Sequence, residues 1–169
     1  AGLVIEKKMT EDEKAELEAK KTAAKASLEQ VTAAPTGDTK AELFIGGTQD
    51  ITVNYPADLE EKAKAANMEV VTTFVSSNPK VANVDAKGKI TAVAAGEVEI
   101  TTTVALSSKI SKSFTTKVLV KEVPVDSVTL NKNALTLNIG AQETLTATVL
   151  PANATNKAVA WTSDNPQVA

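Results

Sequence analysis

The sequence predicts a mostly β protein: an antiparallel β-sandwich in one complete and one incomplete copy, preceded by a short N-terminal α-helix. Three observations support this prediction. Residues 10–31 have the composition of a helix, apolar residues from about Ala41 onward alternate with polar ones, and the order of signals in 41–82 recurs before the end of the chain. Alternation of this kind is typical of strands with one buried face, and such a recurrence indicates repeated modules.

The composition removes most catalytic chemistry. The 169 residues include no Cys and no His, so the usual zinc and iron ligands, the Cys nucleophile and the commonest general base are missing. No nucleophile elbow, phosphate loop or recognisable carboxylate pair occurs. We therefore expect no enzyme, no catalytic or metal-binding residues and no cofactor.

Charge and hydropathy also limit the partners. All 18 basic residues are Lys and the net charge is −3. Because Arg is the residue suited to bidentate phosphate and guanine contacts, this balance disfavours a nucleic-acid partner. No apolar run in the sequence is long enough to span a membrane.

Residues 10–31 are predicted to form the N-terminal helix. Thr10 and Glu13 fit a capping box, in which each side chain satisfies a free N–H at the helix start. Glu16 lies one turn from Lys20, so the two can form an ion pair. The apolar stripe is thin and is not a sustained heptad: Leu17, Ala24, Leu28, Val31. A solvated helix that leans on a neighbour is the favoured interpretation, and an oligomerising or anchoring helix is the alternative.

A linker is expected at residues 33–38, which contain Pro35 and Gly37. The predicted domains are then 1–37, the helical segment and linker; 38–122, a complete sandwich; and 123–169, the first part of a second one.

Within 38–122 the alternation predicts about seven strands, which is the size of an Ig-like domain. The residues that alternate most clearly, and that we expect on the buried faces of strands, are Ile51, Val53, Tyr55; Val98, Ile100, Thr102, Val104; and Phe114, Thr116, Val118, Val120. Residues 85–89 are predicted to form a hairpin turn with Gly88 at positive φ. Residues 56–66 are helix formers without alternation, and we expect a short helix inserted between two strands there.

After Pro124 the same order of signals begins again. Residues 161–169 match 74–82 at five of nine positions. The first copy has 23 steps from Pro56 to Pro79 and the second 15 from Pro151 to Pro166, and this difference of 8 falls on the inserted helix. Counterparts of 83–121 do not follow in the sequence. We expect the natural protein to continue with these strands. They would cover three apolar side chains: Trp161, Leu145 and Val149.

The repeated residues carry a family resemblance. Both copies contain NP-x-VA, and the first continues with DAKGKITAVAAG and an alternating strand. Together these motifs resemble the bacterial Ig-like group 2 (BIG2) family over about 41–169. The resemblance implies modules of bacterial surface adhesins, cell-wall-associated proteins and phage virion proteins, used as spacers or display units, and it brings no catalytic residues.

Three candidate sites each have a structural interpretation that we favour. Phe74 and Trp161 occupy equivalent places in the repeat and are interpreted as core aromatics of a third strand, with a sugar-stacking platform as the alternative. Four aspartates lack the spacing of a calcium site and are interpreted as turn or scattered residues: Asp50, Asp85, Asp126, Asp164. The sequon Asn153-Ala154-Thr155 is interpreted as a polar loop.

The functional hypothesis is a non-catalytic structural or adhesive module displayed on a surface, in a virion or outside the cell. A phage head fibre, decoration or tail protein is favoured, because a helix followed by projecting domains suits an anchor. A bacterial adhesin or cell-wall protein, or an accessory carbohydrate-binding module of a secreted enzyme, is the alternative. The expected partners are capsid, tail or cell-surface proteins, with a surface glycan or a homo-oligomer through the N-terminal helix as further alternatives.

Overall fold

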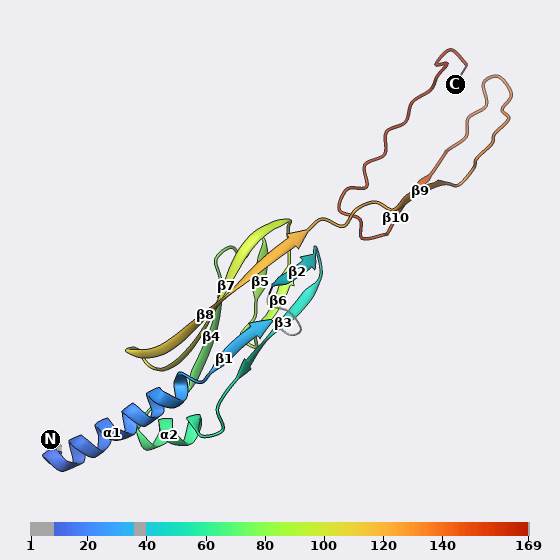
Figure 1. Ribbon diagram of the computed structural model, residues 1–169. Helices are drawn as coiled ribbons and strands as arrows, with labels where there is room; N and C mark the ends of the chain where they lie inside the picture. The colour runs from blue at the N-terminus through green and yellow to red at the C-terminus, as the bar shows by residue number, and fades with distance from the viewer. Residues whose placement is uncertain (1–8, 36–39, 169) are drawn as a thin grey trace, which may run out of the picture. The chain divides into compact units, whose positions relative to one another are not determined.

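The computed structural model describes residues 9–35 and 40–168 (Figure 1). Its contacts divide the chain into two compact units, Ala1–Val120 and Lys121–Ala169. The first contains, in order, α1 (Glu11–Leu28), β1 (Thr32–Pro35), β2 (Ala41–Phe44), β3 (Thr48–Asn54), α2 (Leu59–Ala65), β4 (Val71–Ser76), β5 (Ala82–Val84), β6 (Lys89–Ala92), β7 (Gly96–Ser107) and β8 (Ile110–Lys121). In the described part of the chain, no helix has the length and apolar character needed to cross a membrane.

The strands of the first unit form the predicted sandwich. One sheet has the order β1-β3-β6-β5 and the other β2-β8-β7-β4 (Figure 1). Strands β1, β3, β6 and β5 pair antiparallel in the first sheet, as do β4, β7 and β8 in the second. This is the strand arrangement of an Ig-like fold. The chain passes from one sheet to the other after β1, β2, β3, β4 and β6, so neither sheet is a continuous stretch of sequence.

Small aliphatic side chains fill the space between the sheets. Ile51 of β3, Ile90 of β6 and Ile100 of β7 are at most 4% exposed. The alternation predicted for β7 is confirmed, because its inward residues are buried and their neighbours are not. With aromatic residues at only 3% of the chain, burial of aliphatic surface is the main favourable contribution to folding.

The predicted turn at 85–89 is confirmed and joins β5 to β6. Gly88 has φ 85°, and its amide donates to the Asp85 carbonyl at 3.1 Å. Asp85 Oδ1 accepts from the amides of Lys87 and Lys89 at 2.8 and 2.9 Å. A Cβ at Gly88 would come within 2.8 Å of the Phe74 ring. Glycine is therefore required here by the backbone conformation and also by the close approach of that ring.

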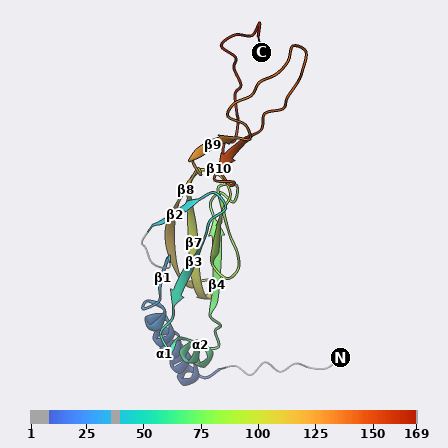
Figure 2. The ribbon, with the colours of Figure 1, turned by 90° about the vertical axis from the view of Figure 1, so that its right-hand side faces the viewer.

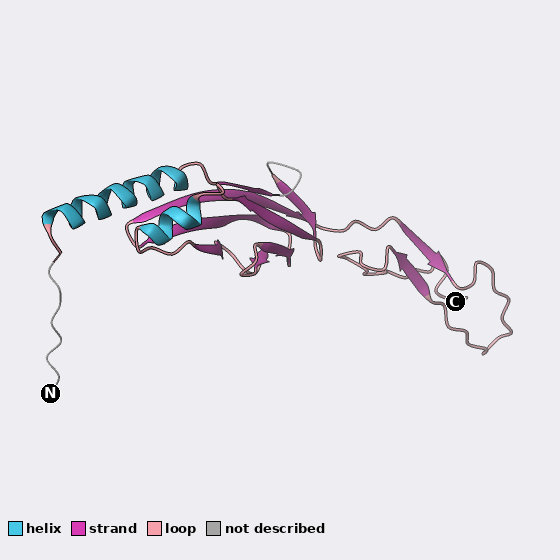
Figure 3. Ribbon diagram, turned by 90° about the horizontal axis from the view of Figure 1, so that it is seen from below, coloured by secondary structure: helices cyan, strands magenta, loops and turns pink. Residues whose placement is uncertain are grey.

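The N-terminal helix is confirmed as α1. Thr10 and Glu13 form the predicted capping box, and Lys20 Nζ lies 2.6 Å from Glu16 Oε1. Helix α1 packs beside α2 at one end of the sandwich, as Figures 2 and 3 both show. The short helix predicted at 56–66 is thereby also confirmed.

A second apolar cluster joins the helices to the strands. Its buried members are Ala24, Leu28, Val31, Leu59, Ala63, Ala66, Val104 and Leu106. The thin apolar stripe of α1 therefore packs against other elements of the first unit. This agrees with the favoured interpretation, in which the helix leans on a neighbour.

The linker predicted at 33–38 is wrong for its first part. Residues Thr32–Pro35 form β1, with Ala33 opposite Val53 and Ala34 opposite Thr52 of β3. Pro35 is tolerated because it ends an edge strand, where a missing N–H need not remove a ladder bond. Residues 36–39 lie outside the described residues. The division at 37 and 122 stays a prediction about separate domains.

The second unit contains one antiparallel strand pair, β9 (Ser127–Leu130) with β10 (Ala147–Leu150). This pair has the place in the repeat that β1 and β3 have in the first copy. Gly140 and Gly46 both have φ 84°, so the repeat extends to the backbone conformation of the turns. The described part of this unit has no other strand, and these large apolar side chains remain exposed: Val125, Val128, Leu130, Leu135, Leu137, Ile139, Leu145, Leu150, Val159, Trp161, Val168.

Candidate functional site

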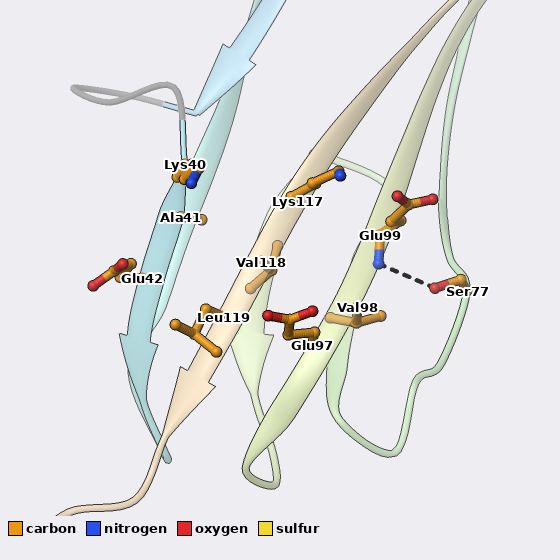
Figure 4. Close-up of a pocket in the computed structure, with 10 residues that line it drawn as sticks. All are labelled: Lys40, Ala41, Glu42, Ser77, Glu97, Val98, Glu99, Lys117, Val118 and Leu119. Carbon is orange, nitrogen blue, oxygen red and sulfur yellow. Dashed lines mark hydrogen bonds between the residues drawn. The ribbon is translucent and has the colours of Figure 1, made fainter.

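A shallow hollow of about 450 Å³ lies on the outer face of the β2-β8-β7-β4 sheet (Figure 4). Polar and charged side chains dominate its lining: Lys40, Glu42, Ser77, Glu97, Glu99 and Lys117. They come from or next to four strands of one sheet, so the hollow depends on the sheet being assembled.

Strand alternation places these side chains outside. On β7, Glu97 and Glu99 flank the buried Val98, and the same alternation turns Lys117 of β8 outward. The strand register sets Glu99 opposite Lys117, a cross-strand pair of opposite charge that contributes about 0.2–1 kcal/mol.

The hydroxyl of Ser77 in this hollow is held by the backbone of β7. The Ser77 hydroxyl accepts from the Glu99 amide at 3.1 Å (Figure 4), and the Ser77 amide donates to the Glu99 carbonyl at 2.9 Å. Ser77 is thereby fixed as part of the backbone network beside β4, whereas an activated serine needs an adjacent base. What the hollow offers a partner is a surface with mixed charge.

The carboxylates with shifted pKa values stabilise the fold. Hydrogen bonds from Lys62 and then Ser27 lower the pKa of Asp58 below its ordinary value. Lys62 Nζ lies 2.6 Å from Asp58 Oδ2, and Ser27 Oγ donates to Oδ1 at 2.5 Å. Since Ser27 belongs to α1 and Asp58 precedes α2, this network ties the two helices together. The amides of Lys89 and Lys87 lower the pKa of Asp85.

The two aromatic candidates have different environments. Phe74 packs partly buried against the core cluster, which confirms its predicted position. Trp161 is 53% exposed, so its predicted core position is wrong for the described structure. Phe74 is covered by the turn at Gly88 between β5 and β6, and the second unit has no counterpart of these strands among its described residues.

Three of the aspartates considered for calcium belong to different structural elements. Asp85 is in the β5–β6 turn, Asp50 is opposite Lys89 in the sheet, and the Asp126 amide donates to the Leu150 carbonyl at 2.8 Å in the second unit. Within residues 9–35 and 40–168, no three His, Cys, Asp or Glu side chains are grouped so as to hold a metal ion.

The sequon residue Thr155 has a structural contact that the sequence did not reveal. Its hydroxyl accepts from the Val123 amide at 2.8 Å, and its own amide donates to the Val123 carbonyl at 2.9 Å. These two bonds fix the loop that contains Asn153, in agreement with a polar loop.

Lys112 is a second residue that sequence reasoning missed. Its Nζ donates to the carbonyls of Glu29 and Val31, the latter at 2.9 Å, and lies 5.2 Å from the centre of the Phe114 ring. The available signal is its phase, because Lys112 takes the position between Ile110 and Phe114 where the alternation of β8 expects an apolar residue.

Two relatives extend these observations. The chain is 34% identical over 127 residues to an uncharacterised protein of Clostridium acetobutylicum, a match that covers 75% of this chain and 12% of that protein. It is 51% identical over 47 residues to an Ig-like virion protein of Serratia phage KSP90, covering 28% of this chain and 18% of that protein. The chain therefore spans a small part of the length of both relatives.

A solved structure and a family model complete the comparison. A GH10 xylanase from termite gut that contains a bacterial Ig-like domain is 24% identical, with a TM-score of 0.30 over 51% of this chain and 20% of that one. The model of the bacterial Ig-like domain (group 2) matches residues 30–114 and 124–169. With both copies of the repeat matched, the chain belongs to the bacterial Ig-like domain (group 2) family.

Proposed function

We propose that the chain is a non-catalytic structural part of a phage virion, such as a head fibre, decoration or tail protein. The observation that carries this proposal is the 51% identity over 47 residues to an Ig-like virion protein of a Serratia phage. Domains of the group 2 family are generally non-catalytic modules. The mixed-charge hollow on the first sandwich supports contact with a partner protein rather than chemistry.

In this proposal the helical end of the first unit attaches the chain to capsid or tail proteins. Helix α2 is an addition to the repeated pattern, since the second copy lacks the inserted residues, and helix α1 precedes the first copy. The exposed face of α1 carries three ion pairs, Lys14–Glu11, Lys20–Glu16 and Lys21–Glu18. Such a face suits a polar contact better than a hydrophobic one.

Immunogold labelling tests the location. Antibodies raised against the purified chain are applied to density-purified particles from the strain or phage whose genome encodes the sequence. We expect gold on the particles, and no gold when the antibody is first absorbed with the purified chain. Particles that stay unlabelled while the cells are labelled would contradict the virion proposal.

A bacterial surface protein is the second candidate. The observation that favours it is the 34% identity over 127 residues to a protein of a bacterium. The same labelling separates the two, because a cell-surface protein labels cells grown without particle production.

A further inference from the structure

The four edge strands of the first sandwich differ in how well they are protected against pairing. Strands β1 and β5 are the edges of one sheet, and β2 and β4 are the edges of the other. Strand β1 ends in Pro35, β5 has 3 residues, and β2 contains Glu42 within its 4 residues. Proline, short length and charge are devices that keep natural edges from adding a strand. Strand β4 has 6 residues, VTTFVS, and none of these devices.

The free hydrogen-bonding groups of β4 follow from its pairing with β7. The Ser77 amide donates to the Glu99 carbonyl, so this pair, at the end of the antiparallel β4–β7 register, is hydrogen-bonded. Hydrogen-bonded and non-hydrogen-bonded pairs alternate along an antiparallel ladder. The residues of β4 whose backbone groups point to the open edge are therefore Thr72, Phe74 and Ser76.

We propose that β4 pairs antiparallel with β4 of a second copy of this chain, which joins the two sheets into one. The two-fold axis passes beside Phe74, so that Phe74 is opposite its own equivalent and Thr72 is opposite Ser76 of the partner subunit. This register uses the free backbone groups on both sides. The proposal does not depend on whether the chain belongs to a virion.

The strand is complementary to itself in this register. On the outer face, Thr73 of one copy lies beside the partner's Val75, and β-branched cross-strand pairs of this kind stabilise sheets. Val71 and Val75, which are 47% and 61% exposed, would gain neighbours. No residue from Val70 to Pro79 is charged, so no like charges meet across the new edge.

The charges beyond the strand also favour a second copy as the occupant. Glu69 precedes β4 and Lys80 follows it. Antiparallel pairing about Phe74 sets the end of β4 that Glu69 precedes beside the end of the partner strand that Lys80 of the partner subunit follows. The symmetry places opposite charges at both ends of the paired strands.

Disulfide trapping tests the register. The sequence has no Cys, so any disulfide that forms must join introduced cysteines. Residues 73 and 75 form a non-hydrogen-bonded pair in the proposed dimer, with Cα atoms about 4.5 Å apart, which a disulfide can bridge. In the full chain, we expect the double variant Thr73→Cys/Val75→Cys to form a covalent dimer on mild oxidation.

The single variants Thr73→Cys and Val75→Cys are the matched controls. Each places its two cysteines two residues out of register, too far apart for a disulfide. Absence of a dimer from the double variant, or equal dimer from the single variants, would overturn the proposal.

Sedimentation of the full chain tests the strength of pairing. Val75→Lys is expected to raise the dimer dissociation constant about tenfold or more, because it removes two cross-strand pairs and adds charge to the edge. Val93→Lys, at a valine that is 48% exposed outside the strands, should leave it unchanged. Association through the exposed apolar residues of the second unit would leave the dissociation constant unchanged in both variants.

A charge exchange completes the test. Glu69→Lys should weaken the dimer, and Glu69→Lys with Lys80→Glu should restore it, while circular dichroism shows that each variant is folded. The proposal fails if the natural chain is monomeric at millimolar concentration, or if Val75→Lys leaves the dissociation constant unchanged.

Discussion

Thr102 points from β7 into the core and is fully buried, and its Oγ1 has no hydrogen-bond partner among the described residues. Thr102→Val keeps the shape of the side chain and removes the hydroxyl. We expect the free energy of unfolding to rise by about 1 kcal/mol, since an unsatisfied buried polar group costs about 1–3 kcal/mol. Denaturant titration measures the change.

The control for this prediction lies next to Thr102 on the other face of β7. Thr103 Oγ1 is 2.9 Å from Ser113 Oγ, with which it forms a hydrogen bond. Thr103→Val should therefore give no comparable gain. An equal gain from both variants would show that the orphaned hydroxyl is not the cause.

Among single residues, Asp85 also makes the stability of the protein depend on pH. The amides of Lys89 and Lys87 hold the pKa of this carboxyl below its ordinary value of 3.8. A lowered folded pKa stabilises the protein fully above the unfolded value, and the contribution is lost as the pH falls through the folded value. Asp85→Asn keeps an acceptor oxygen without the charge. The variant should be less stable than wild type near neutral pH.

Urea unfolding at a series of pH values tests the Asp85 prediction. The difference between wild type and Asp85→Asn should shrink as the pH falls below 3.8, where the wild-type carboxyl becomes neutral. A difference that stays constant from neutral to strongly acidic pH would mean that the charge has no part in it.

At the scale of elements, Lys112 of β8 holds the C-terminal end of α1 through the carbonyls of Glu29 and Val31. Lys112→Met keeps most of the aliphatic stem and removes the ammonium. The free energy of unfolding should fall by about 1–3 kcal/mol, the value of hydrogen bonds to a charged group. Amide hydrogen exchange in residues 24–31 should become faster.

The matched control for Lys112 is Lys109, in the turn between β7 and β8. In the described residues its ammonium makes no contact of this kind. Lys109→Met should leave both the stability and the exchange of α1 unchanged. If the two variants behave alike, loss of any positive charge from this end of the sheet explains the effect.

The sequence predicted those elements whose signals are local. The capping box spans Thr10 to Glu13, and the hairpin at Asp85 is set by Gly88 three residues later, so both are visible in a short window. Strand β1 was missed because TAAP reads as a loop, and its strand character comes from pairing with Ile51–Asn54 of β3. Such pairing is a tertiary effect that overrides local preference.

The candidate surfaces can also be predicted from the sequence only where their signals are local. Alternation alone predicts that Glu97, Glu99 and Lys117 face outward. The hollow also needs β2 beside β8, and this order of strands is a property of the assembled sheet. The phase of Lys112 in β8 marks it as unusual, but it bonds to carbonyls 83 and 81 residues earlier in the chain, a separation at which sequence pattern does not identify the partner.

At the scale of the whole molecule, the two units show what a repeat specifies. Both copies form the same first strand pair and the same turn glycine, so these features do not require the second sheet. A core requires the second sheet as well, since one face of a sheet is buried only by another layer. Phe74 has that layer and Trp161 lacks it among the described residues. Their different exposure is therefore a property of the unit and not of the motif.

The chain enters the first sandwich through β1 and leaves it through β8, and these strands belong to different sheets. A pulling force on the two ends of this unit therefore acts on both sheets, and the aliphatic side chains packed between them are one route by which it passes from one sheet to the other. The contact of Lys112 with the end of α1 offers a second route, because it links the entering segment directly to the leaving strand. Mechanical resistance of this unit consequently depends on its core and on one lysine, in addition to its strand ladders.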